Sequence, residues 1–269
     1  MKRAAACLVG LVGIAAWLVP ASAHAFGDND VVKVGGGVLG WVGANFIDKP
    51  DDQGIVTLDG QALTAEGRPD YPGFSGVTRG FGFFTEVRFV KYVGLELEVI
   101  GTRDSGTADL KVTQSSGGNL QSWEYKAKIS SDAVHVPLLL KGVLPGELVS
   151  GNIFLGPEFV IPEKLGTAGP AIESDDQHRI PGAPSNLIYG ATGKTYTMFT
   201  FGLGLEINLP IPGVDIRLPL AIRGGYNPGI SSSRTDRADY SITGGTLLEE
   251  YKTQWKWEAL GTFGVGVHF

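Results

Sequence analysis

The chain has 269 residues and a formal net charge of −6, with 40 glycines, 10% aromatic residues and 19% charged residues. The excess of acidic residues disfavours a nucleic-acid partner, which would require a basic surface. Many glycines and aromatics with few charges are unusual in a soluble globule and typical of β-barrels. The single cysteine, Cys7, lies at the amino terminus, so the rest of the chain has no disulfide and no thiolate metal site.

The first 25 residues have the three parts of a secretory signal peptide. Lys2 and Arg3 are basic, residues 4–20 are apolar, and Ala23-His24-Ala25 is a small-x-small cleavage site. A retained signal anchor is the alternative, but the apolar run is shorter than the roughly 20 residues of a spanning helix. We therefore predict cleavage after Ala25. Residues 26–269 then form one domain with a net charge of about −8.

Eight segments of this domain alternate apolar with polar or small residues, which is the period of a β-strand with two different faces. In chain order they are residues 31–43, 78–90, 94–103, 121–141, 152–160, 196–208, 215–227 and 254–269. The second has Phe81 and Phe83 on one face and Glu86 and Arg88 on the other. Residues 26–269 contain no apolar run long enough for a transmembrane helix.

The fourth predicted strand, residues 121–141, changes parity in its middle. Its apolar residues are odd-numbered near Trp123 and even-numbered near Leu138. Because a strand of period two cannot change parity without an extra residue, we predict a β-bulge at residues 130–133. The segment is also about twice as long as the 9–11 residues that cross a membrane. We expect its Trp123 half to project beyond the bilayer.

The predicted connections alternate in length. Those after the second, fourth and sixth strands have about 3, 10 and 7 residues, and the others have about 18 to 35. Short periplasmic turns and long extracellular loops are typical of outer-membrane barrels. A secreted β-sandwich, the alternative, has no reason to separate its loops in this way. The sequence predicts an all-β fold, a closed antiparallel up-and-down transmembrane β-barrel of eight strands with both termini in the periplasm.

Aromatic residues lie near both ends of the predicted strands. Tyr226, Trp255 and Trp257 lie toward the long loops and Phe269 ends the chain, as expected at the two membrane interfaces. Residues 92–98 (YVGLELE), 135–141 (HVPLLLK) and 263–269 (FGVGVHF) resemble the small eight-stranded outer-membrane β-barrel family, with porin-like and OmpA-like members. The resemblance implies the outer membrane of a Gram-negative bacterium, contact with its lipids and lipopolysaccharide, and insertion by the outer-membrane assembly machinery.

Strand alternation places eleven charged side chains inside the predicted barrel. They are Glu86, Arg88, Glu96, Glu98, Lys141, Glu158, Glu206, Arg217, Arg223, Lys256 and Glu258. The interior of an eight-stranded barrel is only wide enough for side chains to fill it, and an unpaired buried charge is costly. We therefore predict a polar plug of paired charges. A narrow porin-like channel for ions or small solutes is the alternative, although a selective pore would carry a ring of one charge sign.

The sequence shows no clear catalytic or metal-binding pattern. His135 is expected to point into the lumen and is interpreted as a hydrogen-bonding residue, because a catalytic base needs a nucleophile within reach. We expect no catalytic residues, no metal and no cofactor. Residues 45–77 and 165–195, the long loops, are the expected binding regions for an envelope or cell-surface protein. The predicted function is a structural or binding component of the cell envelope, and an outer-membrane lipid-modifying enzyme is the third possibility after a channel.

Overall fold

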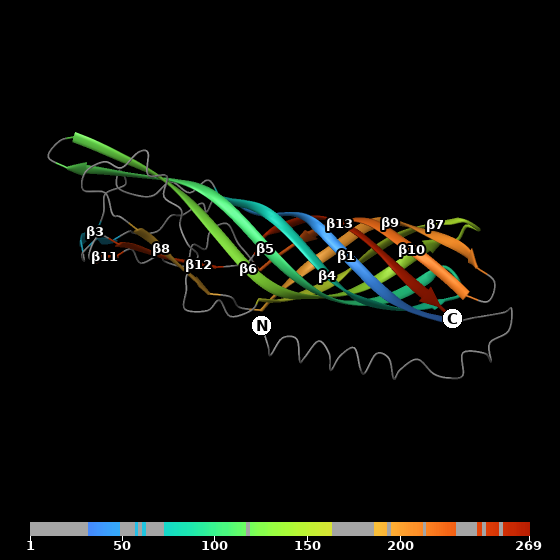
Figure 1. Cartoon of the computed structure of the whole chain (residues 1–269). Coiled ribbons are helices and arrows are strands. Elements are labelled where there is room, and N and C mark those ends of the chain that lie inside the picture. Colours follow the sequence, from blue (N-terminus) through green and yellow to red (C-terminus); the bar gives the residue numbers. More distant parts are fainter. Residues whose placement is uncertain are drawn as a thin grey trace, which may run out of the picture.

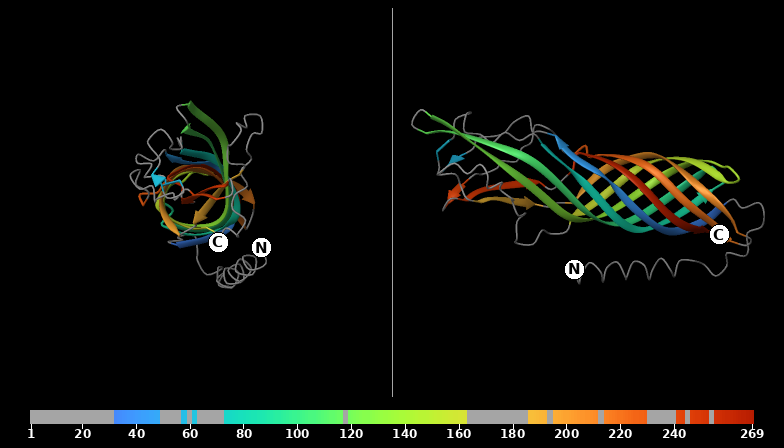
Figure 2. Two further views of the ribbon diagram at one scale, coloured as in Figure 1. Left: turned by 90° about the vertical axis from the view of Figure 1, so that its left-hand side faces the viewer. Right: turned by 45° about the horizontal axis from the view of Figure 1, so that its top comes forward.

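A computed structural model describes residues 32–48, 57–58, 61–62, 73–116, 119–162, 186–192, 195–211, 214–229, 241–243, 246–252 and 255–269. Eight strands form a closed barrel (Figures 1 and 2). Around the ring they are β1 (Val32–Asp48), β13 (Trp257–His268), β10 (Val214–Tyr226), β9 (Tyr196–Ile211), β7 (Val149–Pro162), β6 (Asn119–Leu144), β5 (Val93–Ser116) and β4 (Gly73–Phe89). All eight pairings are antiparallel, and each barrel strand lies beside the next along the chain. The predicted up-and-down barrel is confirmed.

Five shorter strands lie in the connections between barrel strands. β2 (Thr57–Leu58) pairs with β3 (Gln61–Ala62). β8 (Asn186–Thr192), β11 (Ser241–Thr243) and β12 (Thr246–Lys252) form a small sheet in which β12 and β8 are parallel. No helix among the described residues has the length and apolar character needed to cross a membrane. The predicted signal peptide and its cleavage after Ala25 lie outside the described residues.

The hairpin of β5 and β6 extends far beyond the other barrel strands and forms a two-stranded ribbon (Figure 1). β5 pairs with β4 only as far as Thr107, and β6 pairs with β7 only from Ala133 onward. The connection expected over residues 104–120 is therefore wrong, because β5 and β6 run on until two residues separate them. The projection of the Trp123 half beyond the barrel agrees with the prediction.

The bulge predicted at residues 130–133 is also wrong. The ladder between β5 and β6 keeps one register from Val93↔Gly142 to Ser116↔Asn119, so no extra residue is inserted. The parity change in the sequence has a different physical cause. Beyond Thr107 and Ala133 the ribbon has no barrel neighbours, so its two faces are no longer divided into lipid and lumen. Apolar residues there need not keep the parity of the barrel segment.

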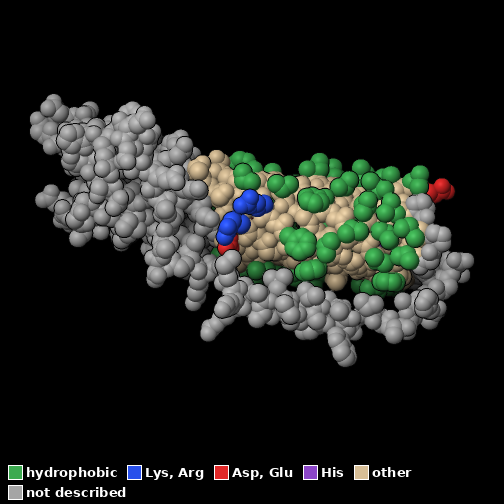
Figure 3. Space-filling view, viewed as in Figure 1, with side chains coloured by type: hydrophobic (Ala, Val, Ile, Leu, Met, Phe, Trp, Pro, Cys, Tyr) green, Lys and Arg blue, Asp and Glu red, His purple; other side chains and the backbone are tan. Residues whose placement is uncertain are grey.

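The outer surface of the barrel is a belt of large apolar side chains (Figure 3). Exposed fractions reach 59% at Phe81, 60% at Leu203 and 71% at Ile222. On β4 the belt runs over the nine residues from Phe81 to Phe89, which matches the 9–11 residues of a membrane-spanning strand. An apolar exterior around a charged interior is the reverse of a soluble protein and is the arrangement that a lipid bilayer requires.

Charged side chains mark the end of this belt on the ribbon side. Arg103 on β5 donates hydrogen bonds of 2.8 and 3.1 Å to the carboxylate of Asp132 on β6, and both side chains are exposed. These hydrogen bonds lower the pKa of Asp132. Arg79 on β4 is exposed as well and lies directly opposite Arg103 in the ladder. The apolar belt is therefore followed by a polar rim.

Two of the short connections are tight. Val90 and Lys91, between β4 and β5, have positive φ angles of 45° and 66°, and the Tyr92 amide donates a 3.2 Å hydrogen bond to the Phe89 carbonyl. This is the backbone of a hairpin turn that glycine and asparagine normally occupy. β9 and β10 are separated by two residues. Both turns lie at the end of the barrel opposite the ribbon.

Some of the predicted interface aromatics are exposed on the outer surface, and one is buried. Trp257 and Phe269 are exposed, and the Trp257 ring packs on Tyr226 with 4.4 Å between ring centroids. Trp255 is buried at 5% exposure, so its predicted position on the lipid face is wrong. β13 begins only at Trp257, and the chain bends at Lys256, which breaks the alternation and turns Trp255 inward.

Candidate functional site

The barrel interior holds charged side chains at three levels along its axis. Nearest the short turns is the turn-end network, which consists of Glu86, Arg88, Glu96, Lys141, Glu206, Asp215, Arg217 and His268. Next is the central pair, Glu98 and Arg223. Nearest the long connections is the loop-end cluster of Asp104, His135, Glu158 and Glu258. Except for Asp215, these residues are less than one-tenth exposed.

Strand alternation brings these residues inward. On β5, Glu96, Glu98 and Asp104 share one parity and are buried, whereas Leu95 and Leu97 have the other parity and are exposed. A strand pleat directs alternate side chains to opposite faces, so one face of β5 supplies acids to all three levels. The alternation of side chains along each strand therefore has two results. It lines the lumen with charged groups and covers the outer surface with apolar ones.

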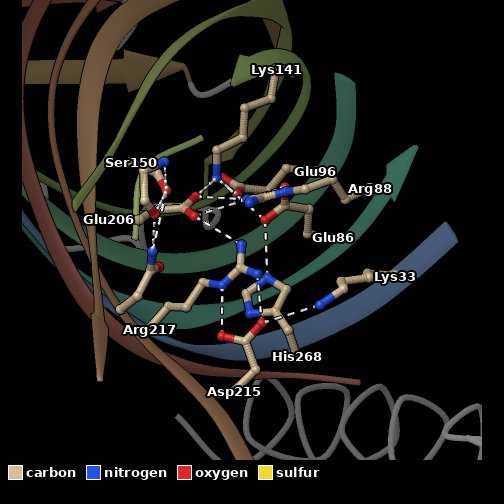
Figure 4. A network of polar contacts seen from close by, with 12 residues as sticks. Lys33, Glu86, Arg88, Glu96, Lys141, Ser150, Glu206, Asp215, Arg217 and His268 are labelled. Atoms are coloured by element: carbon tan, nitrogen blue, oxygen red, sulfur yellow. Dashed lines mark hydrogen bonds and ion pairs between the residues drawn. The ribbon is translucent and has the colours of Figure 1, made fainter. Parts of the chain in front are cut away.

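In the turn-end network, Glu206 is the acceptor for three cations (Figure 4). Its carboxylate accepts two hydrogen bonds of 2.9 Å from Arg88 Nη2 and one of 3.2 Å from Arg217 Nη1, and Lys141 Nζ lies 2.6 Å away. β9, which carries Glu206, lies four positions from β4, which carries Arg88, in the ring of eight. The contact thus crosses the lumen and connects opposite walls.

The other members of the turn-end network complete its pairing. Lys141 Nζ donates to Glu96 at 2.9 Å and to Glu86 at 3.3 Å. Arg88 Nε donates to Glu86 at 2.9 Å, and His268 Nε2 lies 3.2 Å from the other Glu86 oxygen. Arg217 makes two further hydrogen bonds to Asp215, of 3.0 and 2.6 Å. Cations and carboxylates alternate here, so this end of the lumen is a compact plug of paired charge.

The central pair closes the middle of the lumen. The Arg223 guanidinium donates two hydrogen bonds, of 2.6 and 2.5 Å, to the two oxygens of Glu98. It also lies over the ring of Phe154, 4.9 Å from the ring centroid. Phe84, the ladder partner of Glu98, is buried as well. A cavity beside the pair measures about 10 Å³, which is room for about one water molecule.

The loop-end cluster is richer in acid. His135 Nδ1 lies 2.5 Å from Glu158 Oε1, and Thr200 Oγ1 donates to Glu158 Oε2 at 2.6 Å. Thr78 Oγ1 donates to Asp104, whose Oδ2 lies 3.8 Å from His135 Nε2. Unlike the turn-end network, these four cluster residues comprise three carboxylates and one imidazole. The eleven charges predicted for the lumen are six acidic and five basic, but the structure distributes acid and base unevenly along its length.

Ten of the eleven predicted luminal charges lie in these three groups. Lys256 lies instead in the bend before β13 and is half-buried. The sequence reasoning did not include Asp104 in the lumen, although Asp104 continues the even parity of Glu96 and Glu98. The predicted third strand ends at Arg103, one residue before Asp104, whereas β5 continues to Ser116. Asp215 was also omitted, although it shares the parity of Arg217.

No family model matches the chain, and no curated protein matches it. Among solved structures, the chain is similar to Ail of Yersinia pestis in complex with the heparin analogue sucrose octasulfate, with a TM-score of 0.38 and 13% identity over 88% of this chain and 99% of that one. It is similar to the outer membrane protein OprG of Pseudomonas aeruginosa, with a TM-score of 0.38 and 12% identity over 90% and 98% of the two chains. The outer membrane protease OmpT of Escherichia coli follows with a TM-score of 0.29 and 9% identity over 90% and 96%.

Proposed function

We propose that this protein is an outer-membrane barrel with a closed lumen, and that it binds an envelope or cell-surface partner through its ribbon end. The observation that carries the proposal is the β5–β6 ribbon. Nine backbone pairs, from Ala108↔Ala127 to Ser116↔Asn119, extend past the last contacts with β4 and β7. A projecting ribbon has no part in closing the barrel, so its length calls for another role.

The ribbon is suited to binding because its outer edges are unpaired within the described residues. An unpaired strand edge presents a row of N–H and C=O groups that can bind a strand of another chain. The ribbon sequence also carries aromatic residues, Trp123 and Tyr125, of the kind that dominate protein interfaces. A protein partner that adds a strand to this ribbon fits these features.

The filled interior supports binding over transport. The turn-end network and the central pair connect opposite walls by ion pairs, and the cavity beside the central pair has room for about one water molecule. The alternative function, a narrow channel, requires a continuous water path. In planar bilayers we expect no steady conductance. Stable channels whose ion preference changes in Glu98→Gln would instead support the channel.

The polar rim fits the surroundings expected of an outer-membrane protein. Arg79 and Arg103 are exposed cross-strand neighbours immediately beyond the apolar belt. Guanidinium groups bind phosphate by charge-assisted hydrogen bonds, so this position suits the phosphates of lipopolysaccharide. His135 is fully buried in the lumen, away from the lipid face, which argues against a role in modifying membrane lipids. This supports a binding protein rather than an enzyme.

The orientation can be tested by cysteine labelling, because the single cysteine of the sequence, Cys7, lies in the predicted signal peptide. Ser115→Cys is in the ribbon, and Glu147→Cys is in a short turn at the opposite end. In intact cells a membrane-impermeant maleimide should label Ser115→Cys, and should label Glu147→Cys only after the outer membrane is permeabilised. The opposite pattern would contradict the proposed orientation.

Binding can be tested with a photoreactive residue at Thr113, in the ribbon, and a control at Glu147. Irradiation of intact cells should give an adduct of defined mass from position 113 only. A matched deletion joins Thr107 to Lys128, which are cross-strand partners, through Asn-Gly. It should keep the faster gel migration of a folded barrel and lose the partner. Equal crosslinking from both positions would refute the ribbon as the binding element.

A further inference from the structure

The loop-end cluster is assembled from strands that surround the lumen. Asp104 is on β5, His135 on β6, Glu158 on β7 and Glu258 on β13. β6 and β13 lie four positions apart in the ring, so His135 and Glu258 approach from opposite walls. One ligand atom from each of His135, Glu158 and Glu258 lies within 4.8 Å of the others. Three strands far apart in sequence therefore direct donor atoms to one point.

Two members of this cluster have buried polar atoms without a hydrogen-bond partner in the described part of the chain. Both carboxylate oxygens of Glu258 are unpartnered, although the residue is only 4% exposed. His135 Nε2 is buried and unpartnered as well. Buried polar atoms nearly always have a partner, and an exception indicates an unseen water, ion or proton. These unpartnered atoms belong to a group with an excess of acid, so a cation is the partner that fits.

We propose that the loop-end cluster binds a divalent transition-metal ion of the Zn²⁺ class, with His135, Glu258 and Glu158 as its ligands. An imidazole nitrogen combined with carboxylate oxygens is a donor set that suits Zn²⁺, whereas Ca²⁺ and Mg²⁺ prefer oxygen alone. Tetrahedral Zn²⁺ with bonds of about 2.0–2.1 Å holds its ligand atoms roughly 3.3 Å apart. The candidate ligand atoms of the three residues lie within 4.8 Å of one another, which is close to that spacing.

The neighbouring contacts are those of a supported metal site. His135 Nδ1 lies 2.5 Å from Glu158 Oε1, so these two atoms can share one ion, and the second ring nitrogen, Nε2, faces Asp104 Oδ2 at 3.8 Å. A carboxylate on the second ring nitrogen orients a metal-bound imidazole and makes it a better ligand. Thr78 holds Asp104 beside Nε2, and Thr200 holds Glu158. A dication would offset the excess negative charge that these three carboxylates place in a closed space.

An incoming ion can reach the site from one side. The central pair and the turn-end network fill the lumen beneath it. Above it are Tyr196 and Trp255, whose amide donates a 3.5 Å hydrogen bond to the Tyr196 hydroxyl. The ion would therefore enter from the ribbon end and lie under this pair. Such a site would brace opposite walls of the barrel at the level where the strands begin to separate.

The test uses the full-length barrel in detergent, treated with a chelator, dialysed and titrated with Zn²⁺. We expect one equivalent of Zn²⁺ per chain by elemental analysis and a higher thermal unfolding midpoint, with no rise for Mg²⁺. Glu258→Gln and His135→Gln should weaken Zn²⁺ binding by more than the roughly 10- to 100-fold that loss of an outer-shell partner costs, because they remove ligands. Asp215→Asn, which alters an acid at the opposite end of the lumen, is the matched control and should bind Zn²⁺ like the original protein.

A second readout separates metal loss from misfolding. Without metal, Glu258→Gln should unfold at a higher temperature than the unsubstituted chain, because the amide removes an uncompensated charge. With Zn²⁺ the order should reverse. If Zn²⁺ does not move the midpoint of the unsubstituted chain, or moves that of Glu258→Gln equally, the proposal is wrong and a proton satisfies Glu258. Binding that persists in both folded variants would mean a site elsewhere on the surface.

Discussion

Glu98 and Arg223 face each other across the lumen and are joined by two hydrogen bonds of 2.6 and 2.5 Å. Their strands, β5 and β10, lie four positions apart in a ring of eight, so the pair spans the barrel from wall to wall. The residues are 125 positions apart in sequence. No local signal relates them, and the contact exists because the sheet closes.

Removing one member of this pair should destabilise the barrel. Arg223→Met leaves Glu98 as a buried charge without its main partner, which costs about 3–5 kcal/mol. The double variant Glu98→Leu/Arg223→Met should recover most of this loss, because neither charge remains. Urea unfolding of protein refolded into lipid vesicles measures both. Arg103→Gln, at the exposed pair with Asp132, is the control and should leave the stability nearly unchanged.

The apolar belt predicts a position-dependent cost for a charge on the outer face. Leu203 is 60% exposed and lies in the middle of β9, so Leu203→Arg should cost about 2–4 kcal/mol in lipid. Leu144 is 75% exposed at the last position of β6, where Arg should cost about 0–1 kcal/mol. The same vesicle unfolding assay compares them. Equal costs at the two sites would show that the belt does not face a bilayer.

Two glycines of β13 should respond differently to alanine. A Cβ at Gly266 would lie 2.5 Å from the Phe84 ring, whereas a Cβ at Gly261 would meet nothing closer than 3.7 Å. Gly266→Ala should therefore cost about 1–3 kcal/mol through overpacking, and Gly261→Ala should be nearly neutral. Phe84→Leu should relieve the clash, so Gly266→Ala should cost less in that background. If Gly266→Ala destabilises the barrel equally with Phe84 and with Leu at position 84, the strain arises from the backbone and not from the Phe84 ring.

Substitutions in the turn between β4 and β5 should increase the stability of the barrel. Val90 and Lys91 have positive φ angles, which are costly for residues with a Cβ and most costly for a β-branched one. Val90→Asn with Lys91→Gly supplies the residues that this turn prefers and should stabilise the barrel by about 1–3 kcal/mol. Unfolding in urea measures the gain. Lys91→Ala keeps the Cβ and should give no comparable gain, and a stabilisation equal to that of Asn-Gly would contradict the strain argument.

Strand positions and faces could be read from the sequence with good accuracy. The predicted segment 196–208 corresponds to β9 and the segment 152–160 to β7, with ends that differ by a few residues. This works because a pleated strand has a period of two whatever its partners are. Leu203 therefore faces outward and Glu206 inward, and both are predictable from their parity alone.

Residue parity no longer predicts side-chain direction where the barrel ends. Parity correlates with polarity only while one face meets lipid and the other meets the lumen. It failed in the ribbon, where β5 and β6 leave their neighbours, and the expected bulge does not exist. It failed again at Trp255, because the bend at Lys256 reverses the side-chain direction outside a regular strand.

The sequence alone was sufficient for the strand count, the antiparallel order and most of the inward charges, because these depend on local period and on connection length. Only the tertiary structure decided which charges meet. Glu206 contacts three cations from other strands, Glu98 pairs with Arg223, and Glu258 approaches His135 with no hydrogen-bond partner among the described residues. The physical reason is that inward contacts depend on the stagger and closure of the whole sheet. Residues on opposite walls become neighbours only when the last strand pairs with the first.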